Sequence, residues 1–211
     1  MKIAILCASG KAGKAITNEV LERGFNPVCF VRDSPKMNEF ANKIQVVQKD
    51  IFALDSKDLA DFDVIIDAFG EWQDLSLHKK HIESLSKILQ GSRARLLVVG
   101  GAGSLYMDSS HTARLMDMPN FPKEYLGVAQ ATAEVLSFLR DEKGFTWVYV
   151  SPSLELVPTL PKSNHYEIIG EEFKVNANHE SKIGYSDYAS AMIDIALDLG
   201  YKNMRVGVIG L

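Results

Sequence analysis

The chain has 211 residues, of which 46% are hydrophobic and 24% are charged. This balance is typical of a folded globular protein, and it excludes the disordered, collagen-like and coiled-coil classes. The 23 basic and 27 acidic side chains give a net charge of −4, which has the wrong sign for a dedicated nucleic-acid binder. At about 150 residues per domain, we expect one domain over residues 1–211.

Positive charge is concentrated near the N-terminus. Residues 1–50 hold eight Lys and Arg against five Asp and Glu, whereas the other residues hold fifteen against 22. A ligand that carries phosphate would therefore find its counter-charge in this first part of the chain.

The two cysteines, Cys7 and Cys29, both lie in apolar runs. Disulfides therefore cannot be the basis of stability, and we expect buried structural thiols rather than nucleophiles. The apolar run at the N-terminus is too short for a signal peptide or a membrane span. We expect a cytoplasmic protein with no membrane partner.

Short apolar runs alternate with helical patterns along the chain, and glycines punctuate both. Strands are expected at 2–7, 27–31, 44–47, 64–68, 96–99, 148–150 and 206–209, with a further short one around 166–169. Helices are expected at 11–23, at 34–42 with Ser34 as its N-cap, at 54–60, at 74–89, over about twenty residues from 122, and at 186–199.

Two long segments lack a clear pattern. Residues 104–121 follow a glycine-rich strand end, and a loop of this length in a compact domain is usually functional. Residues 151–185 have mixed polarity and are expected to form an elaboration on the substrate side.

This alternation predicts an α/β protein with a doubly wound parallel sheet, covered by helices on both faces. Ligands of such sheets bind outside the carboxyl ends of the strands. The strand ends near residues 7–13, 68–70, 100–104 and 151–153 are therefore expected to converge on one crevice.

The segment that follows the first strand predicts a dinucleotide site. Gly10 lets the backbone approach a pyrophosphate, and Gly13 lets helix and strand pack closely. The N–H groups of the helix start face the same anion, so the predicted contacts are Ser9, Gly10, Lys11, Ala12 and Gly13. Cys7 replaces the first glycine of the three-glycine pattern. The alternative is a tight strand–helix turn that binds nothing.

Two strand ends further along suggest how the adenosine end is bound. Arg32 could hold the 2′-phosphate of NADP, with Lys36 as a second cation. Asp33 has the spacing of a carboxylate that binds the ribose of NAD, although a helix cap is the favoured interpretation. Asp50 could meet the adenine or cap the next turn. NADP is thus the expected cofactor, with NAD left open.

Five segments together resemble one family over nearly the whole chain. They are ASGKAG at 8–13, VRDSPK at 31–36, DAFG at 67–70, VVGGAGSL at 98–105 and VSP at 150–152. The sequence is similar to atypical short-chain dehydrogenases/reductases of the NmrA-like type, especially proteins called NADH-flavin reductases and related to biliverdin IXβ reductase. The resemblance implies a Rossmann fold that binds NADP, a small substrate pocket above the nicotinamide, and cofactor contacts from Ala68, Phe69, Gly70, Gly101 and Pro152.

The sequence departs from the wider superfamily at its catalytic pair. A Tyr-x-x-x-Lys pair would need Lys four residues after Tyr125, and Ala129 stands there. Tyr125 could still reach the pocket with Ser104 opposite it, or it could pack in the core. The resemblance implies hydride transfer to a flavin or tetrapyrrole with water as the proton source, which does not need the lysine.

The five histidines predict no metal site. His78 and His81 are three residues apart on a helix, but no partner is spaced to complete a zinc site. We expect solvated histidines throughout, although His111, His165 and His179 could line a substrate pocket.

The combined prediction is an NADP(H)-dependent oxidoreductase that reduces a flavin, a quinone or a similar conjugated acceptor. The first alternative is a non-catalytic dinucleotide sensor of the NmrA kind. The second is a sugar-nucleotide epimerase or dehydratase, which the missing Tyr-x-x-x-Lys pair disfavours. The oligomeric state is left open.

Overall fold

The computed structural model describes residues 1–211 and centres on an eight-stranded sheet of order β3-β2-β1-β4-β5-β6-β10-β8. The strands are β1 Ile3–Leu6, β2 Val28–Val31, β3 Gln45–Gln48, β4 Val64–Asp67, β5 Arg95–Val99, β6 Thr146–Ser151, β8 Tyr166–Ile169 and β10 Met204–Gly210. All neighbours are parallel except β8, which runs antiparallel to β10. The predicted doubly wound α/β fold is confirmed, with one antiparallel edge strand that the pattern did not indicate.

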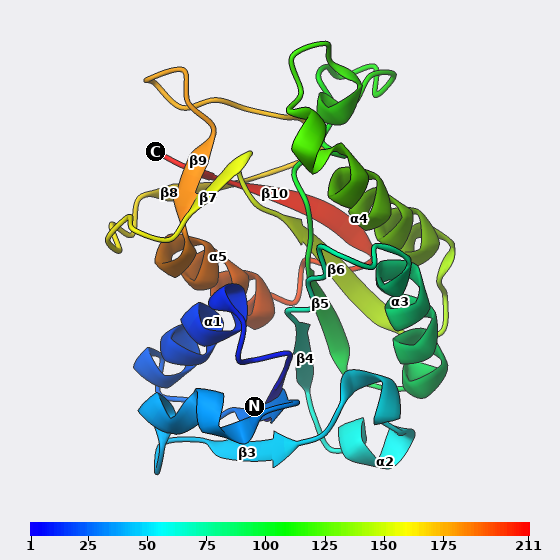
Figure 1. The fold of residues 1–211 in the computed structure, drawn as a ribbon, viewed down its shortest axis with the longest axis vertical. Helices are drawn as coiled ribbons and strands as arrows, with labels where there is room; N and C mark the ends of the chain where they lie inside the picture. The colour runs from blue at the N-terminus through cyan, green and yellow to red at the C-terminus, as the bar shows by residue number, and fades with distance from the viewer.

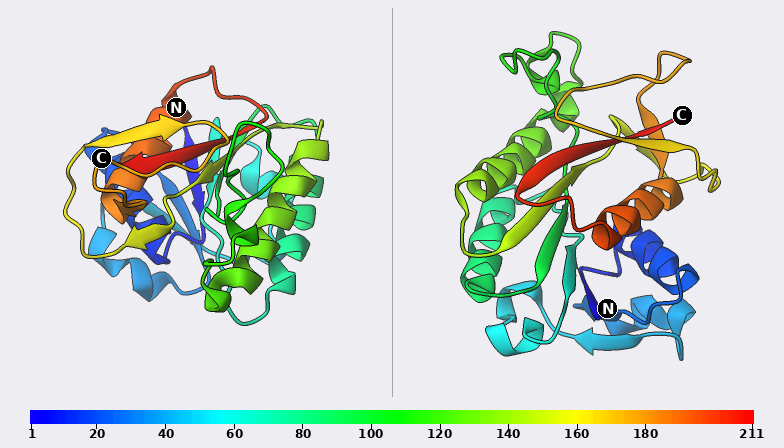
Figure 2. Two further views of the ribbon diagram at one scale, coloured as in Figure 1. Left: turned by 90° about the horizontal axis from the view of Figure 1, so that it is seen from above. Right: turned by 180° about the vertical axis from the view of Figure 1, so that it is seen from behind.

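Helices cover both faces of the sheet (Figure 1). They are α1 Lys11–Glu22, α2 Ser56–Leu59, α3 Ser76–Leu89, α4 Lys123–Asp141 and α5 Tyr185–Leu197, with 3-10 turns η1 Ser34–Phe40, η2 Ile51–Ala53 and η3 Leu115–Asp117. α1 and α5 lie side by side on one face, and α3 and α4 lie side by side on the other (Figures 1 and 2). None of the helices combines the length and the apolar character that crossing a membrane would require.

The central strands are apolar throughout because both of their sides are buried. Ile3 and Ile5 of β1 belong to the core under α1 and α5, whereas Ala4 and Leu6 belong to the core under α3 and α4. Successive side chains of a strand point to opposite faces, so a continuous apolar run supplies both cores.

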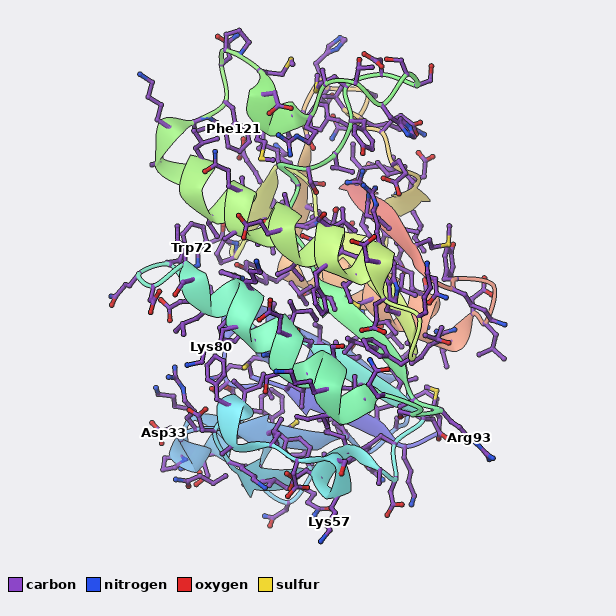
Figure 3. The ribbon with its side chains drawn as sticks, turned by 90° about the vertical axis from the view of Figure 1, so that its right-hand side faces the viewer. Asp33, Lys57, Trp72, Lys80, Arg93 and Phe121 are labelled. Carbon is purple, nitrogen blue, oxygen red and sulfur yellow. The ribbon has the colours of Figure 1, made fainter.

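The strand order places a crevice at the carboxyl ends of the strands. From β1 the chain builds β2 and β3 on one side, and it then returns to place β4 on the other side of β1. Such a switch point separates the flanking loops and leaves room for a ligand. In Figure 3, Asp33, Trp72 and Phe121 lie along this edge of the molecule, and Arg93 lies at the opposite edge.

Two predicted helices take a different form. Residues 34–40 form a 3-10 helix rather than an α-helix, and Asp33, not Ser34, is at its N-cap. The Ser34 hydroxyl instead donates to Gln48 Oε1 over 2.7 Å. Residues 54–60 divide between the end of η2 and the single turn of α2, which Asp55 caps. The Ser34 bond therefore ties this segment to β3, whereas the Asp55 carboxylate bonds locally to the N–H groups of Lys57 and Asp58.

The C-terminal third contains more strand than expected. β7 Glu155–Val157 and β9 Lys182–Gly184 form a separate parallel pair. The long loop after β5 is joined to this part of the chain, because Tyr106 N donates to Glu171 O over 3.0 Å and Phe173 N donates to Tyr106 O over 2.7 Å. The two segments without a clear sequence pattern therefore support each other.

The turn between β1 and α1 depends on two glycines in different ways. A Cβ on Gly13 would lie 2.6 Å from the Cα of Ala8, so only glycine lets the helix pack this closely on the strand. A Cβ on Gly10 would meet only Cys7 O, at 3.6 Å, which is ordinary contact.

We predict that these glycines respond differently to alanine. Gly13→Ala should lower the free energy of unfolding by about 2–3 kcal/mol, because the added methyl group collides with backbone that cannot rotate away. Gly10→Ala should cost about 1 kcal/mol or less, from the weaker N-cap residue alone. Urea unfolding of both variants checks this, and equal stability of the two would contradict the close packing at Gly13.

Candidate functional site

The start of α1 is built to receive an anion. Gly10 is the N-cap residue and provides no side-chain cap, and the first turn contains no acidic residue. The N–H groups of Lys11, Ala12 and Gly13 therefore have no acceptor within the helix, and the positive end of the helix dipole is not compensated. These open donors lie directly after the Gly10 turn, where the sequence predicts a pyrophosphate.

Cys7 adopts a backbone conformation that explains why related turns use glycine. Its φ is +55°, in the left-handed region that a residue with a Cβ rarely adopts. Gly10 N donates to Cys7 O over 3.2 Å and closes the turn. The thiol is half-buried rather than fully buried as expected, whereas Cys29 is buried.

The charges felt by Cys7 show that four strand ends converge. Burial raises the pKa of the Cys7 thiol well above its usual range, the carboxylates of Asp67 and Asp50 raise it further, and Arg32 opposes them. These three residues follow or end β4, β3 and β2. The predicted crevice therefore brings the ends of β1 to β4 within electrostatic reach of one another.

The two predicted cations at β2 are not equivalent. The Arg32 side chain is exposed and makes no hydrogen bond or ion pair within the protein. Lys36 Nζ lies 3.5 Å from Asp33 Oδ2, so part of its charge is already compensated. Asp33 occupies the N-cap position of η1, but its carboxylate accepts no capping hydrogen bond. The favoured interpretation of Asp33 as a helix cap is thus confirmed in position, although the carboxylate makes no capping hydrogen bond.

Asp50 is a cap. Its Oδ1 accepts the N–H of Phe52 over 2.8 Å at the start of η2. This bond occupies one of the two carboxylate oxygens. A contact with adenine would therefore have to use the other oxygen.

The end of β4 is fixed by buried polar groups. Asp67 Oδ1 accepts the N–H of Phe69 over 3.1 Å, and Asp67 Oδ2 accepts a hydrogen bond from His81 Nε2 over 2.8 Å. The Phe69 ring stacks on His81, with 4.4 Å between the ring centroids. His78 Nε2 donates to the carbonyl oxygen of Glu71 over 2.9 Å.

These contacts correct the expectation of solvated histidines. His78 and His81 are both buried on α3 and hold the loop that contains Ala68, Phe69 and Gly70. The positions of both histidines on the apolar face of the helix already indicate burial. The sequence does not reveal that Asp67, at the end of an apolar strand, is the hydrogen-bond partner of His81. No three His, Cys, Asp or Glu side chains come together as a metal-ion site.

The glycines after β5 serve packing against α4 and β6. A Cβ on Gly101 would lie 2.6 Å from Thr132 Oγ1, and a Cβ on Gly103 would lie 2.6 Å from the Cβ of Ala129. Gly101 is one of the residues predicted to contact the cofactor. Its N–H donates to the Tyr149 hydroxyl over 2.9 Å, and that hydroxyl in turn donates to the carbonyl oxygen of Thr132 over 3.0 Å. Tyr149 is thus a supporting residue that the sequence did not reveal.

Two buried hydroxyls at this end of the sheet have no partner. Ser104 Oγ and Ser151 Oγ are inaccessible to solvent and make no hydrogen bond within the protein. A buried polar group without a partner costs about 1–3 kcal/mol, so such groups usually await a ligand or a water molecule. They lie after β5 and at the end of β6, and Pro152 follows Ser151 as a buried residue.

Tyr125 lies at the surface, in the first turn of α4, and not in the core. Its side chain is 47% exposed, and its hydroxyl makes no hydrogen bond to Ser104 or to any other residue. The alternative of core packing is therefore wrong. Its ring and that of Trp72 pack edge to face, with 6.1 Å between the centroids and 74° between the planes.

The residues present fit a phosphate-bearing dinucleotide. The open helix start and the free Arg32 guanidinium offer partners to its phosphates. Two hollows lie elsewhere in the molecule. One of about 620 Å³ is by the amino ends of β1 and β2, and one of about 750 Å³ is between α1 and η1. Neither adjoins the carboxyl ends where ligands of such sheets bind.

The thiols give a prediction with a clear sign. Burial raises the pKa of Cys29 to about 11, and the pKa of Cys7 is raised further. Because the thiolate is the reactive form, neither thiol should react appreciably with a disulfide reagent at pH 8 in the folded protein. Both should react once guanidinium unfolds it. A Cys29→Ala variant isolates Cys7, and fast reaction of that folded variant would contradict the prediction.

Comparison with known proteins identifies the family. The model of the NAD(P)H-binding family matches residues 7–198. The sequence is 38% identical to YwnB of Bacillus subtilis (strain 168) over 211 residues, which cover 99% of this chain and 98% of YwnB.

Solved structures agree with this assignment. SP1627 of Streptococcus pneumoniae TIGR4, described as a "putative NADH-flavin reductase", is 38% identical with a TM-score of 0.95 over 100% of both chains. A "putative epimerase" of Bacteroides thetaiotaomicron is 32% identical with a TM-score of 0.87, over 100% of this chain and 97% of that one. The predicted Rossmann fold and the nicotinamide class of cofactor are confirmed. The chain belongs to the NAD(P)H-binding family.

Proposed function

We propose that the protein is an NADPH-dependent reductase that transfers a hydride to a conjugated acceptor such as a flavin or a quinone. The observation that carries this proposal is the unpaired Arg32 guanidinium directly after β2, within electrostatic reach of Cys7 in the turn that leads to the uncapped start of α1. A planar guanidinium with all its donors free matches a phosphate monoester bidentately, and NADP differs from NAD by that group. The relative described as an NADH-flavin reductase supports the reaction class.

Each part of the crevice has a proposed role. The turn at Ser9 and Gly10 and the N–H groups of Lys11, Ala12 and Gly13 would bind the pyrophosphate. Asp50, Ala68, Phe69 and Gly70 would line the adenosine and ribose, with Lys36 as a weaker second cation. Gly101, Ser104 and Pro152 would surround the nicotinamide end.

When bound, the nicotinamide cofactor supplies the hydride. The chain's residues would orient it and exclude water, and Ser104 would lie near the reacting end. Tyr125 has no lysine four residues later and no hydrogen-bond partner for its hydroxyl, so no residue here is arranged to activate it as an acid or base. The acceptor would take its proton from water.

This arrangement disfavours epimerase chemistry, which requires the protein to remove and return a proton at an alcohol. A sensor that binds cofactor without turnover would share the phosphate site, so turnover separates it from the reductase.

We predict that Arg32 sets cofactor preference. Arg32→Ala should weaken NADPH binding roughly tenfold or more, equivalent to a charge-assisted hydrogen bond of about 1.5–3 kcal/mol, and should leave NADH binding nearly unchanged. Isothermal titration with both cofactors measures this. Arg93→Ala, an exposed arginine at the opposite edge (Figure 3), is the control. Equal weakening for NADH and NADPH would refute the assignment.

We also predict the reaction and its independence from the Tyr125 hydroxyl. The protein should oxidise NADPH when FMN or a quinone is added, and it should oxidise simple alcohols with NADP little or not at all. Tyr125→Phe should lower kcat/KM less than about tenfold, or roughly 1.4 kcal/mol.

Ser104→Ala, assayed with the same acceptor, is the companion variant for this reaction. A loss of about a thousandfold in Tyr125→Phe would show acid–base work by the hydroxyl. Tight NADPH binding without turnover of any acceptor would instead favour the sensor.

A further inference from the structure

The loop after β4 carries a carboxylate that its own backbone holds in place. Glu71 Oε1 accepts the N–H groups of Trp72 and Gln73 over 2.8 and 2.7 Å. The carbonyl oxygen of Glu71 accepts a hydrogen bond from Nε2 of the buried His78 over 2.9 Å. The side chain and the backbone of Glu71 are therefore both fixed, and so is the position of its negative charge.

Arg32 and Glu71 follow the two strands that flank β1. Leu6, the last residue of β1, pairs with Phe30 of β2 on one side and with Asp67 of β4 on the other. Neighbouring strands lie about 4.8 Å apart, so β2 and β4 are roughly 10 Å apart at this level. Arg32 comes directly after β2, and Glu71 comes four residues after the end of β4. The turn that leads into α1 thus has a cation on one side and an anion on the other.

The charges of Arg32 and Glu71 reach each other across this turn. The N–H groups of Gln73 and Trp72 hold the pKa of the Glu71 carboxyl below its usual range, and the charge of Arg32 lowers this pKa further. The same guanidinium acts on Cys7, which lies in the turn itself. Glu71 is therefore ionised at neutral pH, and its charge is felt where Arg32 lies.

Arg32 and Glu71 nevertheless form no ion pair. The Glu71 carboxylate is taken up by the N–H groups of its own loop, and Arg32 makes no hydrogen bond or ion pair within the protein. Asp33, the carboxylate next to Arg32 in the chain, differs from Glu71 because Lys36 Nζ lies 3.5 Å from its Oδ2. The Glu71 charge has no such basic partner, so it acts on a charged group that binds beside Arg32.

We propose that Glu71 is a specificity-determining residue that opposes Arg32, limits the preference for NADPH and keeps NADH usable. This inference rests on the proposed function, in which Arg32 holds the 2′-phosphate. A phosphate monoester carries nearly two negative charges at neutral pH, and a fixed carboxylate within about 10 Å repels it at low ionic strength. NADH has a neutral hydroxyl at the same position. The pyrophosphate is common to both cofactors, so its repulsion by Glu71 cancels when the two are compared.

Titration of a charge-neutral variant with both cofactors tests the proposal. Glu71→Gln keeps a side-chain oxygen that can accept the N–H groups of Trp72 and Gln73, so the loop keeps its conformation while the charge disappears. At about 20 mM salt, the variant should bind NADPH about threefold more tightly than the wild type does. Its affinity for NADH should change less than about 1.5-fold. Isothermal titration measures both affinities without any turnover.

Salt and a distant charge provide the controls. In about 0.5 M KCl, ions screen charges over a few ångströms, so the gain of Glu71→Gln for NADPH should nearly vanish. A gain of the same size at both salt concentrations would show a change of loop shape instead and would overturn the proposal. Asp61→Asn removes one negative charge at an exposed residue beside the hollow at the amino ends of β1 and β2. This matched variant should leave both affinities unchanged.

A double variant shows whether the carboxylate acts on the phosphate itself. In the Arg32→Ala background, Glu71→Gln should still tighten NADPH binding by a similar factor, because the repulsion does not pass through the guanidinium. If the gain disappeared in this background, Glu71 would act only through Arg32, and the direct opposition proposed here would be wrong.

The failure of this proposal and the failure of the proposed function appear in different variants. Unchanged NADPH binding by Glu71→Gln at low salt, or an equal gain for NADH, would overturn the role of Glu71 even if Arg32→Ala weakened NADPH binding as predicted. Equal weakening of both cofactors in Arg32→Ala would instead refute the phosphate site on which the proposed function depends. A wild-type protein that bound NADPH but turned over no acceptor would refute the reductase, and the titrations would still decide the role of Glu71.

Discussion

The approach of α1 to β1 is the constraint on which the site depends. Gly13 lies so close to Ala8 that no side chain fits between helix and strand, and this contact fixes the distance and direction of the helix start. Because the helix cannot withdraw, its first N–H groups point into the space beyond the end of β1. The same turn forces Cys7 to a φ of +55°, so the chain accepts local backbone strain to keep these donors in place.

Buried polar groups hold the loops after β4 and β5 in position. Asp67 and His81 hold Phe69, His78 holds Glu71, and the Tyr149 hydroxyl holds Gly101. A buried polar side chain is favourable only when its partners are all in place, so each pair specifies one loop conformation more sharply than apolar contacts would. The loops after β4 and β5 are therefore held by hydrogen bonds within the protein itself.

Sequence patterns predicted the features that depend on residues close together in the chain. They missed the hydrogen bonds between residues that are far apart in the chain. The turn at Gly10 and Gly13 and the placement of Arg32 follow from spacing along one strand–helix unit, and the parallel sheet follows from apolar runs. The role of His81 could not be predicted in the same way, because its partner Asp67 lies 14 residues away on another element. The same holds for Tyr149, whose hydroxyl serves a glycine 48 residues earlier. In η1 the Ser34 hydroxyl bonds to Gln48 on β3, and in η2 the Asp50 carboxylate caps a single turn, and the helical pattern is weak over so few residues.

The missing catalytic lysine is part of how the loop after β5 is packed. Ala129 is buried against Gly103, and the two residues meet so closely that Gly103 has no room for a Cβ. The N–H of Met116 donates to the carbonyl of Gly103 over 2.9 Å, which ties the following part of the loop to the same place. A lysine at position 129 would need the space that this loop occupies. The small residues at 103 and 129 thus close the region in which a Tyr–Lys pair would operate, while Tyr125 is displaced toward solvent beside Trp72. In this chain, the first turn of α4 therefore presents an exposed aromatic ring at position 125 with no lysine four residues later to lower the pKa of a tyrosine hydroxyl.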